Sequence, residues 1–568
     1  MGSLGPKVFD YDVIIGGAGF SGVCALHHIR ERFPSWRVKV LEASSGAGGT
    51  WHTNRYPGAR VDTESLTYQF SWDKELLDEW HWKETFSPQP DVLDYIERVC
   101  EKHNLYKDMQ FDTRIKSAHW LDGEHSWHIV DTMNFEYKAR FFVSCLGFLS
   151  RPVLPLIPGI ENFQGQAFHT SAWPRDLDHR RHLAGKKIGV IGTGATGIQT
   201  ITAIARESNV GSLTVFQRTA NWSVPLRNKP ISEEEMKQHV KEYPETFARC
   251  ARTSSGFLYQ ADPRNSLDVT TAERLLLWDQ LYNEQGFGKW LGVFKDTYTC
   301  REANRLYSEY ISEKIRKRIR DPEVADSLIP KDHGFGTRRV PLESGYFEVY
   351  DQPNVHLADL KKAPIKGVIA TGIHTQDGKT HELDVLILAT GFNAITGSFS
   401  EIDFRGRRGR PLLGYSDTEN GKNAAIWVDH KPKTFLGIMI PDMPNMFMVL
   451  GPHQPFGNGT RSLENAVDVV CAMLQHIFDH GYSYAAPKDE AVRAWGKHVV
   501  ECNQGFLANE IDSWMTGVNT NVKGKQERSV ARYAGSVIGY RKRCSDAAQT
   551  GWGDLDFARL DSDLEPGL

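Results

Sequence analysis

The same glycine-rich pattern occurs twice in the chain, each time directly after a run of apolar, strand-forming residues. The first copy is GAGFSG at residues 17–22, and the second is GTGATG at residues 192–197. In each copy a helical stretch follows and leads to a second apolar strand, as in a dinucleotide-binding unit. The first glycine makes the turn, the second admits a pyrophosphate close to the backbone, and the third lets helix and strand pack closely. The pattern therefore predicts an α/β fold with two Rossmann-like domains.

The residue at the end of the second strand distinguishes the two copies. Glu42 lies 20 residues beyond Gly22, where a carboxylate accepts hydrogen bonds from both ribose hydroxyls of an adenosine. The same count in the second copy gives Gln217, followed by Arg218 and Thr219. An acid would repel a 2′-phosphate, whereas a guanidinium and a hydroxyl bind one. We therefore expect FAD in the first unit and NADPH in the second; the alternative for Arg218 is a solvated surface side chain.

The composition is that of an ordinary globular protein, with 40% hydrophobic and 24% charged residues. The 67 Lys and Arg against 71 Asp and Glu leave a net charge of −4, which excludes a general attraction to nucleic acid or an anionic membrane. No apolar run reaches the ~18 residues of a membrane span, and residues 1–13 lack the apolar core of a secretory signal. The 8 cysteines form no C-x-x-C pair, so we expect no metal site and no disulfide framework. A cytoplasmic, reduced chain without an obligate protein partner is expected.

Two dinucleotide units in one chain imply hydride transfer from NADPH to a tightly held flavin. The reduced flavin must then pass its electrons to a disulfide, to a partner protein or to oxygen. The absence of a C-x-x-C pair from the sequence disfavours the disulfide route and leaves the other two open.

The segment between the two units carries the pattern Phe163-x-Gly165-x-x-x-His169-x-x-x-Trp173-Pro174. It resembles the fingerprint of the type I Baeyer–Villiger monooxygenases, flavoenzymes that insert an oxygen atom beside a ketone carbonyl. The related flavin monooxygenases that oxygenate nitrogen or sulfur usually lack the Trp-Pro ending. In the Baeyer–Villiger family this segment lies between the domains and couples NADPH binding to catalysis.

Two further segments extend the resemblance over nearly the whole chain. Residues 48–62, GGTWHTNRYPGARVD, resemble the family stretch that wraps the isoalloxazine ring, in which Asp62 orients a catalytic arginine. The link Ala389–Gly391 resembles the return from the nicotinamide domain to the flavin domain. The pair His52-Thr53 departs from the family, which commonly has two aromatic residues there, and would admit a bulkier ketone. The loop GPHQPFGN at residues 451–458 is similar to fungal members that act in secondary metabolism.

The resemblance also identifies the catalytic group. The segment GTRRVPLESGYFEVYDQPNVHL matches a family stretch in which Arg339 is the catalytic arginine and Arg338 replaces a lysine that contacts the 2′-phosphate. By this likeness, NADPH reduces FAD, oxygen gives a flavin C4a-peroxide, and the peroxide converts a ketone to an ester or lactone. Arg339 would hold the negative charge in a water-poor pocket, and Asp62 would fix its orientation.

The predicted catalytic residues are thus Arg339 and Asp62. The predicted cofactor-binding residues are Gly17, Gly19, Gly22, Glu42, Thr50, Trp51, His52, Thr53, Arg60, Val61, Asp62, Tyr68, Ile115, Thr193, Gly194, Ala195, Thr196, Gly197, Ile198, Gln199, Arg218, Thr219, Arg338 and Trp514.

Hydrophobic periodicity gives the domain organisation. Three stretches within residues 231–319 have apolar residues every three or four positions opposite charged faces, which is typical of amphipathic helices. The segments VHLADL, KGVIATGIHT and DVLILATGF are predicted strands that complete the NADP-binding domain. The predicted ranges are 1–145 and 392–568 for a discontinuous FAD-binding domain, 146–222 and 333–391 for the NADP-binding domain, and 223–332 for a helical insertion.

Three functions remain open at this point. The first is a monooxygenase that uses a ketone and O2, with a bulky secondary-metabolite ketone as one substrate. The second is a flavin monooxygenase that oxygenates sulfur or nitrogen on the same cofactors and needs no arginine-held anion. The third is a catalytically inactive flavin-binding or regulatory protein.

Overall fold

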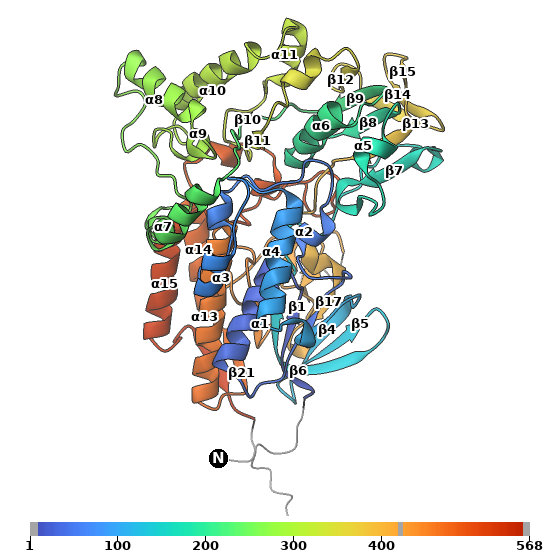
Figure 1. The fold of residues 1–568 in the computed structure, drawn as a ribbon. Helices are drawn as coiled ribbons and strands as arrows, with labels where there is room; N and C mark the ends of the chain where they lie inside the picture. Colours follow the sequence, from blue (N-terminus) through green and yellow to red (C-terminus); the bar gives the residue numbers. More distant parts are fainter. Residues whose placement is uncertain (1–8, 419–423, 561–568) are drawn as a thin grey trace, which may run out of the picture.

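The computed structural model describes residues 9–418 and 424–560, so the parts of the predicted domain ranges at 1–8, 419–423 and 561–568 lie outside it. Two sheets with parallel strands organise the described residues (Figure 1). An eight-stranded sheet contains β1 and a five-stranded sheet contains β8, the strands that precede the two glycine turns. The predicted α/β class with two Rossmann-like units is therefore confirmed.

The first unit consists of β1 (Tyr11–Gly16), α1 (Phe20–Arg32) and β2 (Val38–Leu41). β1 pairs in parallel with β2 on one side and with β6 on the other. The sheet has the order β17-β4-β5-β6-β1-β2-β3, and β20 also pairs with β6, so strands from both ends of the chain share it. The other strands are β3 (Met109–Gln110), β4 (Ile115–Leu121), β5 (Ser126–Asp131), β6 (Glu136–Ser144), β17 (Asp403–Arg405) and β20 (Met446–Met448).

Alternating side chains of β1 pack on opposite faces of this sheet, as the period of two along a strand requires. Val13 and Ile15 belong to the cluster formed with α1 and α13 (Gly459–Asp479), whereas Ile14 packs with Phe142 and Trp127 on the other face. All five side chains named here are fully buried. The run of apolar residues in β1 therefore reflects a strand that is covered on both faces.

The second unit is a five-stranded, entirely parallel sheet in the order β12-β9-β8-β16-β7. Its glycine turn leads from β8 into α6 (Ala195–Glu207). The strands are β7 (Gln166–His169), β8 (Lys187–Ile191), β9 (Ser212–Gln217), β12 (Val355–Asp359) and β16 (Val385–Leu388).

One strand prediction is wrong. The segment KGVIATGIHT is two strands, β13 (Ile365–Ile369) and β14 (Gly372–Thr375), which pair antiparallel. Together with β15 (Thr380–Glu382) they form a separate three-stranded sheet and do not join the parallel one. The chain reverses at residues 370–371, so the apolar run covers two short strands.

The predicted helical insertion lies between β10 (Val224–Pro225) and β11 (Leu342–Glu343), which pair with each other in parallel. In Figure 1 most of its helices lie in the upper part of the molecule, whereas α7 (Glu233–Arg252) lies lower, beside α3 (Lys74–Glu79). Two of these helices begin with a capping box, which is formed by Ser232 and Glu235 in one helix and by Thr270 and Glu273 in the other. The helices are α7 (Glu233–Arg252), α8 (Thr271–Asn283), α9 (Gly288–Leu291), α10 (Arg301–Arg316) and α11 (Pro322–Leu328).

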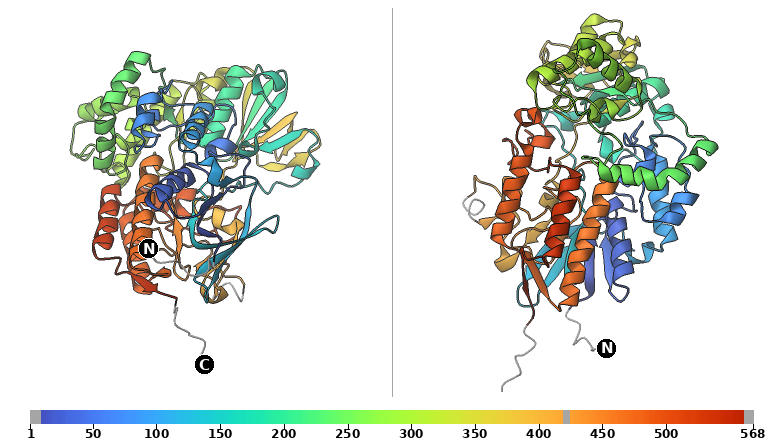
Figure 2. Two further views of the ribbon diagram at one scale, coloured as in Figure 1. Left: turned by 60° about the horizontal axis from the view of Figure 1, so that its bottom comes forward. Right: turned by 90° about the vertical axis from the view of Figure 1, so that its left-hand side faces the viewer.

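Helices near the carboxyl end lie beside the first sheet, and Figure 2 shows them in orange and red. Within residues 9–418 and 424–560, no helix combines the length and the apolar character needed to cross a membrane. The remaining helices and strands are α2 (Thr50–Thr53), α3 (Lys74–Glu79), α4 (Gln89–Lys102), α5 (His179–His182), β18 (Leu413–Gly414), β19 (Trp427–Val428), β21 (Tyr484–Pro487), α14 (Asp489–Asn503), α15 (Val537–Gln549) and β22 (Leu555–Ala558).

The two connections between the sheets run side by side and antiparallel. Pro152 and Phe392 form a bridge, and the N–H of Val153 donates to the carbonyl of Gly391 at 2.9 Å. His169 of the fingerprint segment is buried beside them. Its Nδ1 accepts from the N–H of Ser171 at 3.1 Å, so its Nε2 carries the proton and donates to the Gly391 carbonyl at 3.1 Å. The fingerprint thus fixes the return connection through a neutral histidine, and burial lowers the pKa of that histidine.

A second buried histidine holds the loop that follows β20. His453 Nε2 donates to the carbonyl of Val530 at 3.0 Å, while the Thr434 hydroxyl lies 3.0 Å from Nδ1. A neutral ring with its proton on Nε2 satisfies both nitrogens, with the Thr434 hydroxyl donating to Nδ1. Burial lowers the pKa of His453 to about 4.

This arrangement predicts a loss of stability in acid. Unfolded histidine binds protons below about pH 6.5, whereas the buried ring does so only near pH 4, so stability falls as the pH drops between these values. The contribution of one such ring reaches about 3 kcal/mol at the acid limit. We expect His453→Gln to unfold at a midpoint temperature that depends less on pH between 7.5 and 5 than the parent's. The exposed His81→Gln is the control, and equal pH dependence of parent and His453→Gln would contradict the assignment.

Candidate active site

In the first glycine turn, two glycines are required by the protein itself and one faces open space. Gly17 has a φ of +101°, and a Cβ on Gly22 would lie 1.9 Å from the Gly17 carbonyl oxygen. A Cβ on Gly19 would come no closer than 3.5 Å to another residue, Gly49, which is an ordinary contact. Packing within the chain therefore does not explain Gly19.

The second turn repeats this arrangement. Gly192 has a φ of +110°, and a Cβ on Gly197 would lie 2.2 Å from the Gly192 carbonyl oxygen. A Cβ on Gly194 would meet nothing within 4 Å. Both middle glycines thus leave a cradle that a side chain would fill and that a pyrophosphate fits.

The helix starts behind the two turns favour an anion. α1 and α6 begin without a side-chain cap and without an acidic residue in the first turn. Their first N–H groups and the positive end of the helix dipole therefore face the cradle. The predicted residues on the second turn or the start of α6 are Thr193, Ala195, Thr196, Ile198 and Gln199.

Glu42 directly follows β2 and is 7% exposed. Its Oε2 accepts from the N–H of Ala18 at 2.7 Å, and its Oε1 accepts from the N–H of Ser44 at 2.7 Å. The carboxylate is therefore fixed beside the glycine turn, where an adenosine ribose would lie in a bound dinucleotide.

A cluster of cationic groups lies at the end of β9 in the second unit. Arg218 is exposed, and Thr219 lies beside the turn, where its carbonyl accepts from the Thr193 hydroxyl at 3.0 Å. The Nε of Arg338 is buried without a hydrogen-bond partner. Burial lowers the pKa of Arg338, and the nearby Arg218 cation lowers it further, against the effect of Asp332. Two guanidinium groups with an unsatisfied donor are suited to bind a phosphate.

Arg339 and Asp62 form an ion pair between two segments that are far apart in the sequence. Nη2 of Arg339 lies 2.5 Å from Oδ2 of Asp62, and the side chains are 33% and 16% exposed. Asp62 follows the loop after α2, whereas Arg339 precedes β11, 277 residues further along the chain. The structure therefore brings the two predicted catalytic residues together.

Tyrosines surround this pair. Tyr68 accepts a hydrogen bond from the indole N–H of Trp51 at 3.1 Å, and Tyr56 donates to Gln199 of α6 at 2.9 Å. Burial raises the pKa of both tyrosines to about 12, so both hydroxyls remain neutral at physiological pH. The loop from Tyr56 also approaches α6 closely at Gly58, whose Cβ would lie 2.7 Å from the Gln199 carbonyl oxygen. This is one contact between the first unit and α6 of the second.

The residues of α2 lie at the edge of the first cradle. Thr50 is exposed, and the hydroxyl of Thr53 donates to the Gly49 carbonyl at 3.1 Å. The His52 ring lies near Ser45, and Arg175 is 3.1 Å from its Nε2. The structure therefore directs His52 toward the loop that follows β2, and the prediction of extra room for a ketone stays a prediction.

Four predicted cofactor residues lie elsewhere around the site. The guanidinium of Arg60 donates to Glu84 at 3.0 Å, and Val61 is buried behind the ion pair. Ile115 begins β4 and is buried, close to the space beside Gly16. Trp514 packs with a small apolar group that includes Phe456. The structure gives Arg60 a protein partner, and its cofactor role stays a prediction.

Sequence reasoning missed two residues beside the ion pair. Glu64 is buried and accepts a hydrogen bond from Tyr259 of the insertion, 195 residues away. Neither residue belongs to a recognisable motif. The one available signal was the position of Glu64, two residues after Asp62.

Two dinucleotide cradles joined at an Arg–Asp pair define a nucleotide-dependent flavoprotein. Residues 12–228 match the family model described as flavin-binding monooxygenase-like. A Baeyer–Villiger monooxygenase from Pseudooceanicola batsensis is 35% identical over 550 residues, which are 96% of each chain. The phenazine N-monooxygenase PhzNO1 of Lysobacter antibioticus is 36% identical over 545 residues, which are 95% of each chain.

A solved structure agrees with this likeness. The crystal structure of OTEMO in complex with FAD and NADP matches at a TM-score of 0.90 and 35% identity, over 97% of this chain and 100% of that chain. The chain belongs to the flavin-binding monooxygenase-like family, and the resemblance to its Baeyer–Villiger members is confirmed.

The two glycines of the second turn predict different consequences of the same substitution. Gly194→Ala should fold like the parent, because its Cβ meets no protein atom, but should raise the KM for NADPH by roughly 10-fold or more. Gly197→Ala should lower the thermal unfolding midpoint, because its Cβ would overlap the Gly192 carbonyl. Steady-state kinetics and thermal unfolding measure both effects. A Gly194→Ala variant with an unchanged KM would argue against a pyrophosphate in this cradle.

Proposed function

We propose that this protein is a Baeyer–Villiger monooxygenase that uses FAD, NADPH and O2 to convert a ketone to an ester or lactone. The observation that carries the proposal is the Arg339–Asp62 ion pair, which lies where the two dinucleotide units meet. The relatives named above support the reaction class, and the crystal structure that contains FAD and NADP supports the cofactors.

The residues present fit both cofactors. In the proposal, the first glycine turn and Glu42 hold FAD, while the second turn, Arg218, Thr219 and Arg338 hold NADPH. The bound flavin supplies the redox and oxygen chemistry, and the nicotinamide supplies the hydride. The protein supplies position, charge and exclusion of water.

Arg339 provides a permanent cation, because a guanidinium is not deprotonated in proteins. Addition of an oxygen nucleophile to a ketone would place negative charge on the former carbonyl oxygen, before migration of a carbon substituent completes the insertion. The N–H groups of Arg339 can hydrogen-bond that charge in a partly dry site, and one such donor is worth about 2.7–4 kcal/mol. Asp62 occupies one edge of the guanidinium and so fixes the direction of its remaining donors.

The competing activity is oxygenation of nitrogen or sulfur. A relative of almost equal identity is named as an N-monooxygenase, so identity alone does not separate the two activities. A nitrogen or sulfur atom donates its own electron pair and leaves no anionic adduct to be held. The paired, half-buried Arg339 therefore favours the ketone reaction.

We also propose the five ranges given above as the domain division. They are supported by the ends of β6 at Ser144, α11 at Leu328 and β16 at Leu388, each within a few residues of a predicted boundary. A reducing compartment is supported by eight free cysteines, and we propose that the enzyme acts in the cytoplasm without an obligate protein partner.

The decisive test concerns Arg339. Arg339→Ala should abolish the ester product, a loss of at least roughly 100-fold, while FAD stays bound, because the anion loses its cation. The parent and the variant are incubated with NADPH and a panel of cyclic, linear and bulky polycyclic ketones, and products heavier by one oxygen are measured. A thioether serves as the matched substrate, and its oxygenation should depend less on Arg339. Retained ester formation would overturn the assignment of Arg339.

Cofactor preference tests the phosphate cluster. Arg218→Ala should lower the ratio of kcat/KM for NADPH to that for NADH by about 10- to 100-fold, because a charge-assisted hydrogen bond to phosphate is lost. Exposed Arg320→Ala is the control for a general loss of positive charge. An unchanged ratio in Arg218→Ala would leave this residue as a solvated surface arginine.

A further inference from the structure

The helical insertion contacts the Asp62 side of the ion pair through one buried hydrogen bond. The Tyr259 hydroxyl donates to Oε1 of Glu64, two residues beyond Asp62. Glu64 is 7% exposed, and its Oε2 is buried without a partner. Tyr259 therefore supplies the hydrogen bond that ties the Glu64 carboxylate to a segment outside its own loop.

A glycine in the insertion makes room for this bond. Gly286 has a φ of +66°, and a Cβ there would lie 2.2 Å from the Tyr259 hydroxyl and 2.5 Å from Oε1 of Glu64. The N–H of Gly286 donates to the carbonyl of Leu226 at 3.1 Å, just after β10. The turn at Gly286 therefore lies against both the Tyr259–Glu64 hydrogen bond and the residue that follows β10.

The Arg339 side of the ion pair is connected to the same turn at Gly286. Lys289 is fully buried, and its ammonium donates to the carbonyls of Pro225 at 2.8 Å, Glu284 at 2.7 Å and Gly286 at 3.1 Å. Pro225 belongs to β10, which pairs with β11, and β11 begins three residues after Arg339. One lysine therefore connects the insertion to the pair β10–β11, which lies three residues after the arginine.

We propose that Tyr259, Glu64 and Lys289 are positioning residues. They keep the Arg339 guanidinium and the Asp62 carboxylate at the separation seen in the ion pair. The inference rests on the proposed function, because it assigns a purpose to a catalytic pair. In this arrangement the insertion sets the separation of the two charges from both sides. None of the three residues needs to touch the substrate.

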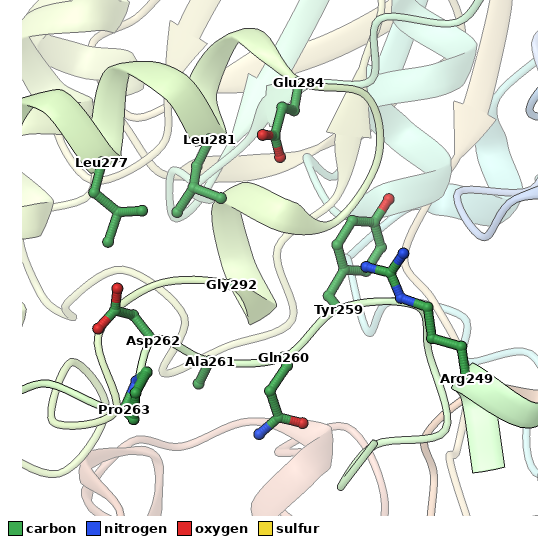
Figure 3. Close-up of a pocket in the computed structure, with 10 residues that line it drawn as sticks. All are labelled: Arg249, Tyr259, Gln260, Ala261, Asp262, Pro263, Leu277, Leu281, Glu284 and Gly292. Carbon is green, nitrogen blue, oxygen red and sulfur yellow. The ribbon is translucent and has the colours of Figure 1, made fainter. Parts of the chain in front are cut away.

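Tyr259 has two separable roles. Its ring lines a cavity of about 320 Å³ in the insertion (Figure 3). In that view its side chain points away from that of Gln260, and the hydroxyl is directed out of the group of labelled residues. A Tyr259→Phe variant keeps the ring in the cavity wall and removes the hydroxyl, which reaches Glu64 and also lies 3.3 Å from the Gln285 carbonyl oxygen.

The test compares Tyr259→Phe with a matched control in the full-length holoenzyme. Tyr310→Phe is the control, because the Tyr310 hydroxyl also donates to a carboxylate of the insertion, Asp279, at 2.7 Å, away from the ion pair. Tyr259→Phe should reduce ester formed per NADPH oxidised by roughly 10-fold, since small misplacements at a reacting centre can cost up to about 100-fold. Flavin content and the KM for NADPH should not change. Tyr310→Phe should match the parent.

Conservative replacement separates positioning from stability. Glu64→Gln keeps an oxygen that can accept from Tyr259 and should retain most of the ester formed per NADPH oxidised. Glu64→Ala should lose as much of it as Tyr259→Phe. The double variant Tyr259→Phe/Glu64→Ala should be no worse than Tyr259→Phe alone, because both single variants remove the Tyr259–Glu64 hydrogen bond. Independent, additive losses would overturn the proposal.

Hydrogen exchange provides a readout independent of turnover. Tyr259→Phe should speed amide exchange in residues 62–68, and Lys289→Met should speed it in residues 223–226 and 341–343. Equal exchange in Tyr259→Phe and the parent would overturn the inference. If Arg339→Ala retains ester formation, the proposed function is wrong. If Arg339→Ala loses ester formation while Tyr259→Phe forms as much ester per NADPH oxidised as the parent, only the positioning role is wrong.

Discussion

The Arg339–Asp62 ion pair joins two segments that are 277 residues apart, one that follows α2 and one that precedes β11. A charge–charge contact in a partly dry site is stronger than one in water, but it requires both side chains to be held where they meet. Much of the surrounding structure does this. The loop at Gly58 fits against α6, Tyr56 donates a hydrogen bond to Gln199, and β11, paired with β10, begins three residues after the arginine.

The features that could be predicted from the sequence are those with local causes. Gly17 and Gly22 are fixed by backbone geometry within six residues, and the middle glycines by a ligand, so the pattern can be recognised without a structure. Amphipathic periodicity likewise predicted α7, α8 and α10. The hairpin of β13 and β14 was missed because its turn residues, Ala370 and Thr371, have none of the usual turn chemistry.

Contacts between distant segments left no such signal. Tyr259 lies in an irregular stretch between two helices, and Glu64 in a sequence resembles any solvated acid. Their hydrogen bond exists only because the insertion folds back on the first unit. Arg60 illustrates the same limit, since its guanidinium is bonded to Glu84 across an antiparallel bridge region that no short motif marks. The individual site residues were therefore predicted better than the contacts that support them.

The paired connections at Pro152 and Phe392 constrain how the two units can move. A single connection would permit twisting as well as bending, whereas two hydrogen-bonded connections resist twisting. The His169 bond to Gly391 stiffens this ribbon further at one end. Resistance to twisting favours a single relative orientation of the two units, the one in which the Arg339 and Asp62 side chains meet.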